Sequence, residues 1–356
     1  MIAARRPGLA PSRVEVVGLR TPLCDLLGID VPIVQAPVST VPALVAAVSG
    51  AGGLGVLQLS WLDLEQTRAA IRETRRLTDR PFGVNLVLEW QQHERLAVAL
   101  EEGVPVVSLF WGDPAPYMDV VRERGARCIF TAGSAVEARR AVALGADAIV
   151  AQGWEAGGHV WGEVATLALV PAVVDAVAPV PVVAAGGISD GRGLAAVLSL
   201  GAAGAWVGTR FVASDEAGLH PLYKQLVCEA SETDTVHSSL FDVGWPEAPH
   251  RTLRNSTVRL WEQGGRSASG ARPGEREPVA ATRDGTPVLR YSVDDPTSEM
   301  TGELEALALY AGQGVALVHD VLPAGEIVRS MAAEAMRVLA DLTARDQPSR
   351  LSDPLP

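Results

Sequence analysis

Short apolar segments alternate with longer amphipathic segments over the first two-thirds of the chain. Eight apolar segments are predicted strands: residues 31–37, 53–58, 82–88, 104–110, 127–132, 148–153, 180–187 and 205–211. The intervening segments show helical periodicity, as in 62–77 and in 134–145, where Ser134 is a predicted N-cap, Glu137 completes a capping box and Gly145 ends the helix. Strands that are apolar throughout fit a parallel sheet covered on both faces, and eight of them predict a (β/α)8 barrel.

The pattern changes after residue 235. Residues 262–288 are rich in glycine, proline and charge, so they are predicted to be a surface loop or connector that covers the barrel mouth as a lid. Later apolar segments predict helices that pack back on the barrel. The expected organisation is an N-terminal extension (1–20), the barrel (21–235), a loop-rich lid or connector (236–300), C-terminal helices (301–342) and a flexible tail (343–356).

Composition narrows the function to small-molecule chemistry. The 356 residues carry a formal net charge of −12, which argues against a nucleic-acid or anionic membrane surface. Three cysteines form no CxxC pair, and no metal-binding motif occurs, so neither a disulfide framework nor a metal site is expected. No export signal and no apolar span long enough for a bilayer is recognised, which predicts a cytoplasmic enzyme. A homodimer is the candidate assembly.

Glycine pairs follow the last two predicted strands. Gly186 and Gly187 precede a helix expected to start at Ser189 or Asp190, and Gly208 and Thr209 follow the next strand. Either loop could be a tight turn only. Together they indicate a phosphate site, in which free amides and the positive end of the helix dipole face one point. A GxGxxG pattern at residues 50–55 runs from helix to strand, the reverse of a dinucleotide fingerprint, and is predicted to be a turn.

One histidine stands apart from the other five. His159 lies in a glycine-rich loop after the sixth predicted strand, on the face where barrels carry their active sites. Imidazole can accept a proton at neutral pH or, when protonated, hold an anion; a purely structural role is the alternative. Asn85 and Gln152, polar residues in otherwise apolar strands, either satisfy buried hydrogen bonds or reach a ligand.

Several segments, in this order, resemble the nitronate monooxygenase (2-nitropropane dioxygenase) family: QAPVSTVPALVAAVSGAGGLG, GVNLVL, QGWEAGGHVWG, VPVVAAGGISDGRGLAAVLSLGAAGAWVGTRF and HPLYKQLV. The resemblance runs from about Thr21 to His237 and resumes around YAGQGVALVHDVLPAGEIV. It implies one bound FMN and a histidine, His159, beside the flavin ring. The implied cofactor-binding residues are Ala36, Pro37, Val38, Asn85, Thr131, Gln152, Gly157, Gly158, Gly186, Gly187, Gly208, Thr209 and Gln313.

The resemblance leaves more than one activity open. The first is oxidation of alkyl nitronates or nitroalkanes by dioxygen to a carbonyl compound and nitrite, with His159 as base or anion partner. The second is reduction of an enoyl thioester or quinone through FMN by NAD(P)H, because FMN-dependent enoyl-acyl carrier protein reductases share a similar EAGGHxG segment. Here Val160 and Trp161 separate His159 from Gly162, which departs from that spacing. A third class consists of phosphate-binding barrels. An inosine-monophosphate-dehydrogenase-like enzyme is disfavoured because the 153–162 loop has no nucleophilic cysteine, and a phosphosugar isomerase is the other alternative, which a colourless purified protein would favour.

Overall fold

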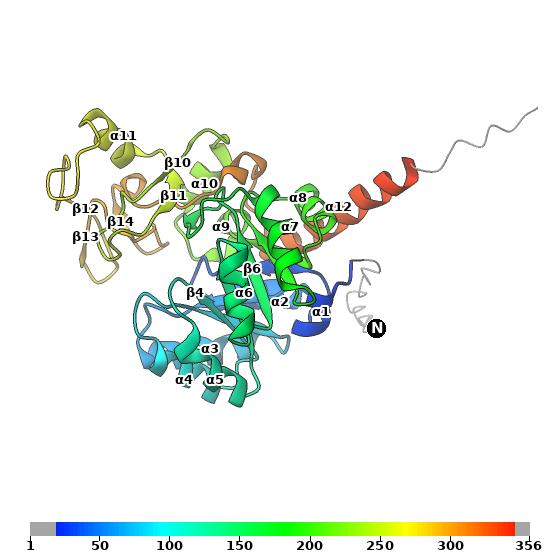
Figure 1. Ribbon diagram of the computed structural model, residues 1–356. Coiled ribbons are helices and arrows are strands. Elements are labelled where there is room, and N and C mark those ends of the chain that lie inside the picture. Colours follow the sequence, from blue (N-terminus) through cyan, green and yellow to red (C-terminus); the bar gives the residue numbers. More distant parts are fainter. Residues whose placement is uncertain (1–18, 346–356) are drawn as a thin grey trace, which may run out of the picture.

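The protein is built on a closed barrel of eight parallel strands, as predicted. The computed structural model describes residues 19–345 (Figure 1). Around the barrel the strand order is β1-β9-β8-β6-β5-β4-β3-β2. The ring closes where the amides of Gln35 and Leu54 each donate a 2.9 Å bond to the neighbouring strand. The strands are β1 (Ile33–Gln35), β2 (Gly55–Gln58), β3 (Phe82–Val87), β4 (Val106–Phe110), β5 (Arg127–Ala132), β6 (Ala148–Gln152), β8 (Val182–Ala185) and β9 (Gly204–Val207).

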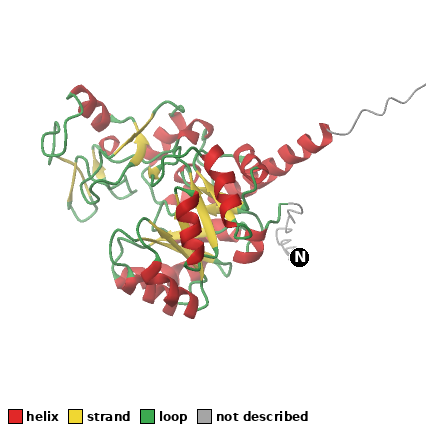
Figure 2. Cartoon of the chain, in the orientation of Figure 1, coloured by secondary structure: helices red, strands yellow, loops and turns green. Residues whose placement is uncertain are grey.

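Helices surround these strands (Figure 2). They are α2 (Pro42–Gly50), α3 (Leu64–Leu77), α4 (His93–Glu101), α5 (Ala115–Glu123), α6 (Ala135–Ala143), α7 (Thr166–Val177), α8 (Gly191–Ser199) and the short α9 (Thr209–Val212). Ser134 caps α6 as predicted, by accepting a bond from the Glu137 amide. The Glu137 carboxylate bonds the Gly133 amide at 2.8 Å instead of the Ser134 amide. The capping box is therefore displaced by one residue.

Two apolar layers hold the barrel together. One fills its interior and includes Val56, Val106 and Val183; α1 (Pro22–Leu27) adds Leu23 to the same cluster. The other lies between strands and helices, where α12 (Ala324–Arg345) packs against α8 and α2. Because most of the strands contribute to both layers, their sequences are apolar without alternation. No helix among residues 19–345 is long and apolar enough to cross a membrane.

A second lobe follows the barrel and lies at one side of it, opposite the end of α12 (Figure 1). Its first sheet has the order β10-β11-β7, formed by β10 (Thr235–Ser238), β11 (His250–Leu253) and β7 (Gly158–His159). Its second has the order β13-β12-β14, formed by β13 (Pro287–Leu289), β12 (Pro278–Ala281) and β14 (Thr301–Gly302). The lobe also contains α10 (Pro221–Glu229) and α11 (Ser256–Gln263). Since β7 belongs to the loop after β6, this sheet joins the lobe to the barrel mouth.

The boundaries expected outside the barrel differ from the observed elements. Residues 262–288 contain the end of α11 and all of β12, so they are not wholly irregular. The expected tail from 343 begins inside α12, which extends to Arg345. Residues 1–18 of the expected extension and 346–356 of the tail lie outside the described residues.

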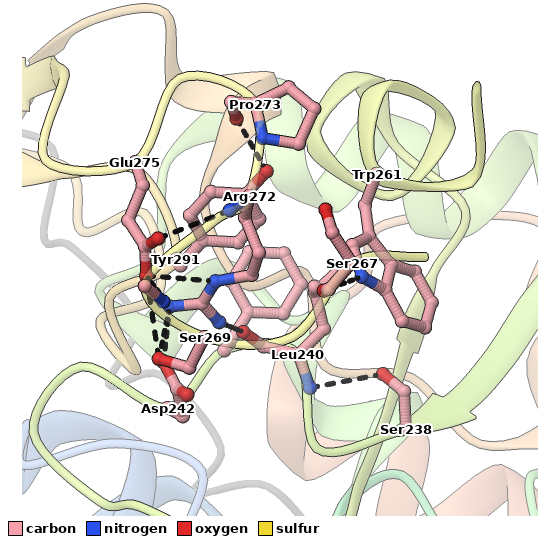
Figure 3. A network of polar contacts seen from close by, with 12 residues as sticks. Ser238, Leu240, Asp242, Trp261, Ser267, Ser269, Arg272, Pro273, Glu275 and Tyr291 are labelled. Carbon is pink, nitrogen blue, oxygen red and sulfur yellow. Dashed lines mark hydrogen bonds and ion pairs between the residues drawn. The ribbon is translucent and has the colours of Figure 1, made fainter. Parts of the chain in front are cut away.

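A buried arginine organises the lobe (Figure 3). The Arg272 side chain is 3% exposed and forms ion pairs with Asp242 (2.8 Å) and Glu275 (2.7 Å). It also donates to the Leu240 carbonyl oxygen at 2.8 Å and stacks on Tyr291, whose hydroxyl donates to the Pro273 carbonyl oxygen at 2.7 Å. Every part of the guanidinium is thus paired, which offsets the cost of burying its charge.

Replacing Arg272 with methionine is expected to lower the free energy of unfolding by about 3–5 kcal/mol, because Asp242 and Glu275 lose their cation in a buried setting. Arg283→Met is the matched control: its ion pair with Glu299 is exposed on both sides and should contribute at most about 1 kcal/mol. Urea unfolding curves of the two variants measure the difference. Equal losses would show that the Arg272 network does not hold the lobe.

Candidate active site

A cavity of about 760 Å³ lies over the carboxyl ends of the barrel strands. Twelve of the thirteen residues expected at the cofactor line it, together with His159: Ala36, Pro37, Val38, Asn85, Thr131, Gln152, Gly157, Gly158, Gly186, Gly187, Gly208 and Thr209. Gln313 is the exception. Its neighbours Gly312 and Gly314 line the cavity, and its own amide donates to the Glu155 carbonyl oxygen at 3.0 Å.

The glycine loops after β8 and β9 form one end of the cavity. Gly186 and Gly187 have φ angles of 106° and 71°, in the left-handed region that glycine adopts without strain. Among residues 19–345 no acceptor is found for the amides of Gly187, Gly208 and Thr209. These amides therefore remain available to an anion.

The start of α8 contributes less to this end than the sequence suggested. Asp190 is the N-cap, but its carboxylate accepts the Gly193 amide at 3.0 Å. The Gly191 amide donates to Glu334 of α12 at 2.8 Å. Two of the first amides of the helix are thus already paired, so the anion-binding groups are those of the loops and not the helix terminus.

A segment from the far end of the chain completes this part of the cavity. The Gly312 amide donates to the Thr209 hydroxyl at 3.0 Å. A Cβ atom on Gly157 would collide with the backbone of Ala311 and Gly312. The loop after β6 and residues 311–314 can approach this closely only because glycine occupies both positions.

Polar side chains lie on the floor of the cavity. Asn85 is 2% exposed and Thr131 is 7% exposed, and neither side chain has a hydrogen-bond partner among the described residues. Gln152 differs, because its amide nitrogen donates to the His159 carbonyl oxygen at 3.0 Å and its oxygen accepts the Trp161 amide at 3.1 Å. Asn85 and Thr131 are free for a ligand, whereas Gln152 holds the histidine loop in place.

His159 is surrounded by aromatic rings. Its ring stacks on Trp245 with centroids 3.9 Å apart, and the rings of His250 and Tyr310 lie at 5.4 and 5.5 Å. Its Nε2 atom is buried without a hydrogen-bond partner. Burial, with a smaller contribution from His250, lowers the pKa of His159 well below 6.5. The imidazole is therefore neutral at neutral pH and suits proton acceptance, not the holding of an anion by positive charge.

Two walls of the cavity had not been expected from the sequence. One is aromatic and includes Trp61, Phe110, Trp245 and Tyr310. The other is the segment 293–299, which carries Asp294, Asp295 and Glu299. No residue of 262–288, the expected lid, is among the described lining residues, and no lysine or arginine is. The sequence around these residues does not indicate that they line a cavity, because they reach the barrel mouth only through the packing of the second lobe.

The family follows from a match over most of the chain. The model of the nitronate monooxygenase family matches residues 20–94 and 89–334. The chain belongs to this family. The resemblance inferred from the sequence is thereby confirmed, and the protein is an oxidoreductase.

Relatives in this family carry different names. The chain is 35% identical to a nitronate monooxygenase of Pseudomonas aeruginosa, over 87% of this chain and 97% of the relative. It is also 35% identical to the (3aS,4S,5R,7aS)-5-hydroxy-7a-methyl-1-oxo-octahydro-1H-indene-4-carboxyl-CoA dehydrogenase of Mycobacterium tuberculosis, over 92% of this chain and 99% of the relative. Family membership therefore gives the class of enzyme without its substrate.

The similar solved structures also carry different names. FabK from Thermotoga maritima superposes with a TM-score of 0.78 at 35% identity, covering 92% of this chain and all of the other. The nitroalkane oxidase from Streptomyces ansochromogenes superposes with a TM-score of 0.72 at 31% identity, covering 90% and 99%. Both support the barrel with its additional lobe as the fold of this family.

Proposed function

We propose that the protein is an FMN-dependent oxidoreductase that converts nitroalkanes or their nitronates and dioxygen to carbonyl compounds and nitrite. The observation that carries this proposal is that one cavity is lined both by unpaired loop amides and by a neutral, unpartnered imidazole. The names of the P. aeruginosa relative and the S. ansochromogenes structure support the substrate class.

The cavity residues fit FMN. A volume of about 760 Å³ is in the range of cofactor sites. The amides of Gly187, Gly208 and Thr209 would hold the phosphate, while Asn85 and Thr131 would bond polar groups of the ring or ribityl chain. The backbone of Ala36 to Val38 would lie along the ring edge. When bound, FMN supplies the electron-transfer chemistry that no side chain here can provide.

The protein's own residues would handle the proton. In the proposal, His159 accepts the proton on the carbon next to a nitro group, since its neutral imidazole is a base at working pH. Gln152 fixes the backbone at the His159 carbonyl oxygen and the Trp161 amide, and Trp245 holds the ring in one orientation. The aromatic wall restricts water around the imidazole, which keeps the base unprotonated.

A second candidate is NAD(P)H-dependent reduction of an enoyl thioester or quinone through FMN. The M. tuberculosis relative's name specifies a carboxyl-CoA substrate, and FabK is among the similar structures. The charge of the cavity favours an uncharged reacting group: it is lined by Asp294, Asp295 and Glu299 without lysine or arginine. A thioester carbonyl and a nitroalkane are both uncharged, whereas a nitronate is an anion and is less favoured by this lining.

An anaerobic absorbance experiment decides between the candidates. The flavin-loaded protein would be mixed separately with propyl-2-nitronate, 2-nitropropane and NADH. Loss of the oxidised flavin spectrum with a nitro compound, followed by recovery and nitrite release in air, supports the first function. Rapid reduction by NADH alone, with no response to nitro compounds, assigns the protein to the second. A protein that binds no flavin contradicts both.

A further inference from the structure

The segment 293–299 forms a fixed arch over the cavity. The Pro296 carbonyl oxygen accepts the His220 amide at 2.9 Å, and the Ser298 amide donates to the Gly218 carbonyl oxygen at 3.0 Å. On the other side, the Val293 carbonyl oxygen accepts the Tyr310 hydroxyl at 2.8 Å. Since both ends are bonded to separate parts of the protein, the side chains of the arch are held over the cavity mouth.

Asp295 is a carboxyl on this arch with no partner of opposite charge. It lines the cavity together with Tyr223 and Tyr310, and burial and, to a smaller extent, the charge of Asp295 raise the pKa of both hydroxyls. The two tyrosine hydroxyls are already used, Tyr223 donating to the Tyr310 carbonyl oxygen at 2.6 Å and Tyr310 donating to the Val293 carbonyl oxygen. Within residues 19–345, no lysine, arginine or histidine nitrogen lies within 4.0 Å of its carboxylate.

The adjacent aspartate has a different environment. Asp294 is exposed and accepts a 2.6 Å bond from the Ser292 hydroxyl. Asp295 is partly buried, and burial together with the charge of Asp294 raises its pKa to about 7, against the opposing effect of its own backbone amide. The other ionisable groups lining the cavity are Glu299, Tyr223, Tyr310 and His159. None of them is a cation at neutral pH, so no opposite charge in the cavity lining stabilises the charged form of Asp295.

We propose that Asp295 determines substrate charge: its protonated carboxyl donates a hydrogen bond to an uncharged nitro or carbonyl oxygen, and its ionised form disfavours anionic ligands, nitronates included. The inference rests on the proposed function only in requiring a substrate oxygen at this position, which both candidate reactions supply. A protonated carboxyl is both donor and acceptor, whereas a carboxylate accepts only. Ionisation would therefore remove the donor and introduce repulsion in one step.

The binding of two ligands of the same shape tests the role of Asp295 without turnover. The neutral probe is 2-methylpropanamide, and the probe that is anionic above its own pKa is 2-methylpropanoate. Calorimetry on the flavin-loaded protein would give the Kd of each probe from pH 5.5 to 8.5. The amide should weaken about tenfold as the pH rises through 7, and the carboxylate should weaken more. Asp295→Asn keeps a donor but cannot ionise, so it should bind both ligands with no step near pH 7. Asp294→Asn is the control: it should retain the step, moved to lower pH because the charge of Asp294 contributes to the raised pKa of Asp295.

Thermal unfolding without ligand gives an independent reading. A carboxyl whose pKa is raised in the folded protein destabilises that state as the pH rises from the unfolded to the folded pKa. The Tm of Asp295→Asn should therefore exceed that of the parent by an amount that grows from about pH 4 to about pH 7 and then levels off. A constant Tm difference, or ligand binding without a pH step in the parent protein, overturns the proposal. Because neither measurement uses a nitro compound, failure of nitronate turnover would count against the proposed function alone.

Discussion

Replacing His159 with asparagine lowers turnover of 2-nitropropane by about 10²–10⁴-fold while flavin content is unchanged. This is the usual contribution of a positioned general base. The loss should be much smaller for propyl-2-nitronate, because its carbon has already lost the proton that His159 would accept. Asparagine is polar and smaller than histidine, and the His159 side chain makes no hydrogen bond within the described residues. The fold should therefore tolerate the change. Steady-state rates with both substrates, measured on protein of equal flavin content, test this.

The pH profile of the parent protein provides a second reading of the same role. Because the pKa of His159 is lowered well below 6.5, the base should remain unprotonated at mildly acidic pH. Activity with 2-nitropropane that depends on His159 should be lost only as the pH falls far below 6.5. His93→Asn is a control, since His93 lies at the start of α4, stacked on Tyr117 and away from the cavity lining. Equal losses for the two substrates in His159→Asn would remove proton abstraction from the mechanism.

Replacing Gly208 with aspartate should give a protein that binds FMN at least about 10²–10³-fold more weakly. Gly208 lies between β9 and α9, where the loop amides have no acceptor within the described residues. A carboxylate placed there would meet the dianionic phosphate at short range, and like charges in such a site cost several kcal/mol. Fluorescence titration of the apoprotein with FMN gives the dissociation constant.

Gly208→Ala separates charge from space. The φ angle of Gly208 is −107°, which any residue can adopt, and a Cβ atom would contact Ala36 and Val38 at 3.6 and 3.8 Å, ordinary packing distances. Alanine should therefore retain most of the FMN affinity. If aspartate and alanine weaken FMN alike, or if aspartate has no effect, the phosphate does not lie against this loop.

Local features of the chain were sufficient to predict the barrel. Each predicted strand combines a β-branched apolar run with a turn residue at its end, and each observed barrel strand lies within or close to the expected range. The glycine loops and His159 were also recognisable, because the carboxyl ends of parallel strands meet at one face of a barrel. That is why residues as distant as Ala36 and Thr209 could be expected around one cavity.

Other features depended on partners that no local pattern reveals. The amide of Gly191 is taken by Glu334, 143 residues later, and the amide of Gln152 is used within its own loop. In both cases a hydrogen bond within the protein uses a donor that, from the sequence, had seemed available to a ligand. The lining by Trp245 and by the arch 293–299 likewise arises from the second lobe, whose strands are too short and irregular to show a period.

By itself, the sequence determined the barrel, its family and the residues whose backbone conformation or polarity marks the cavity. The tertiary structure alone decided the protonation of His159, the pairing of the α8 amides and the acidic, cation-free character of the cavity mouth. The physical reason is the range of the forces involved. Strand and turn preferences act between near neighbours in the chain, whereas burial and charge act between groups that meet only after folding.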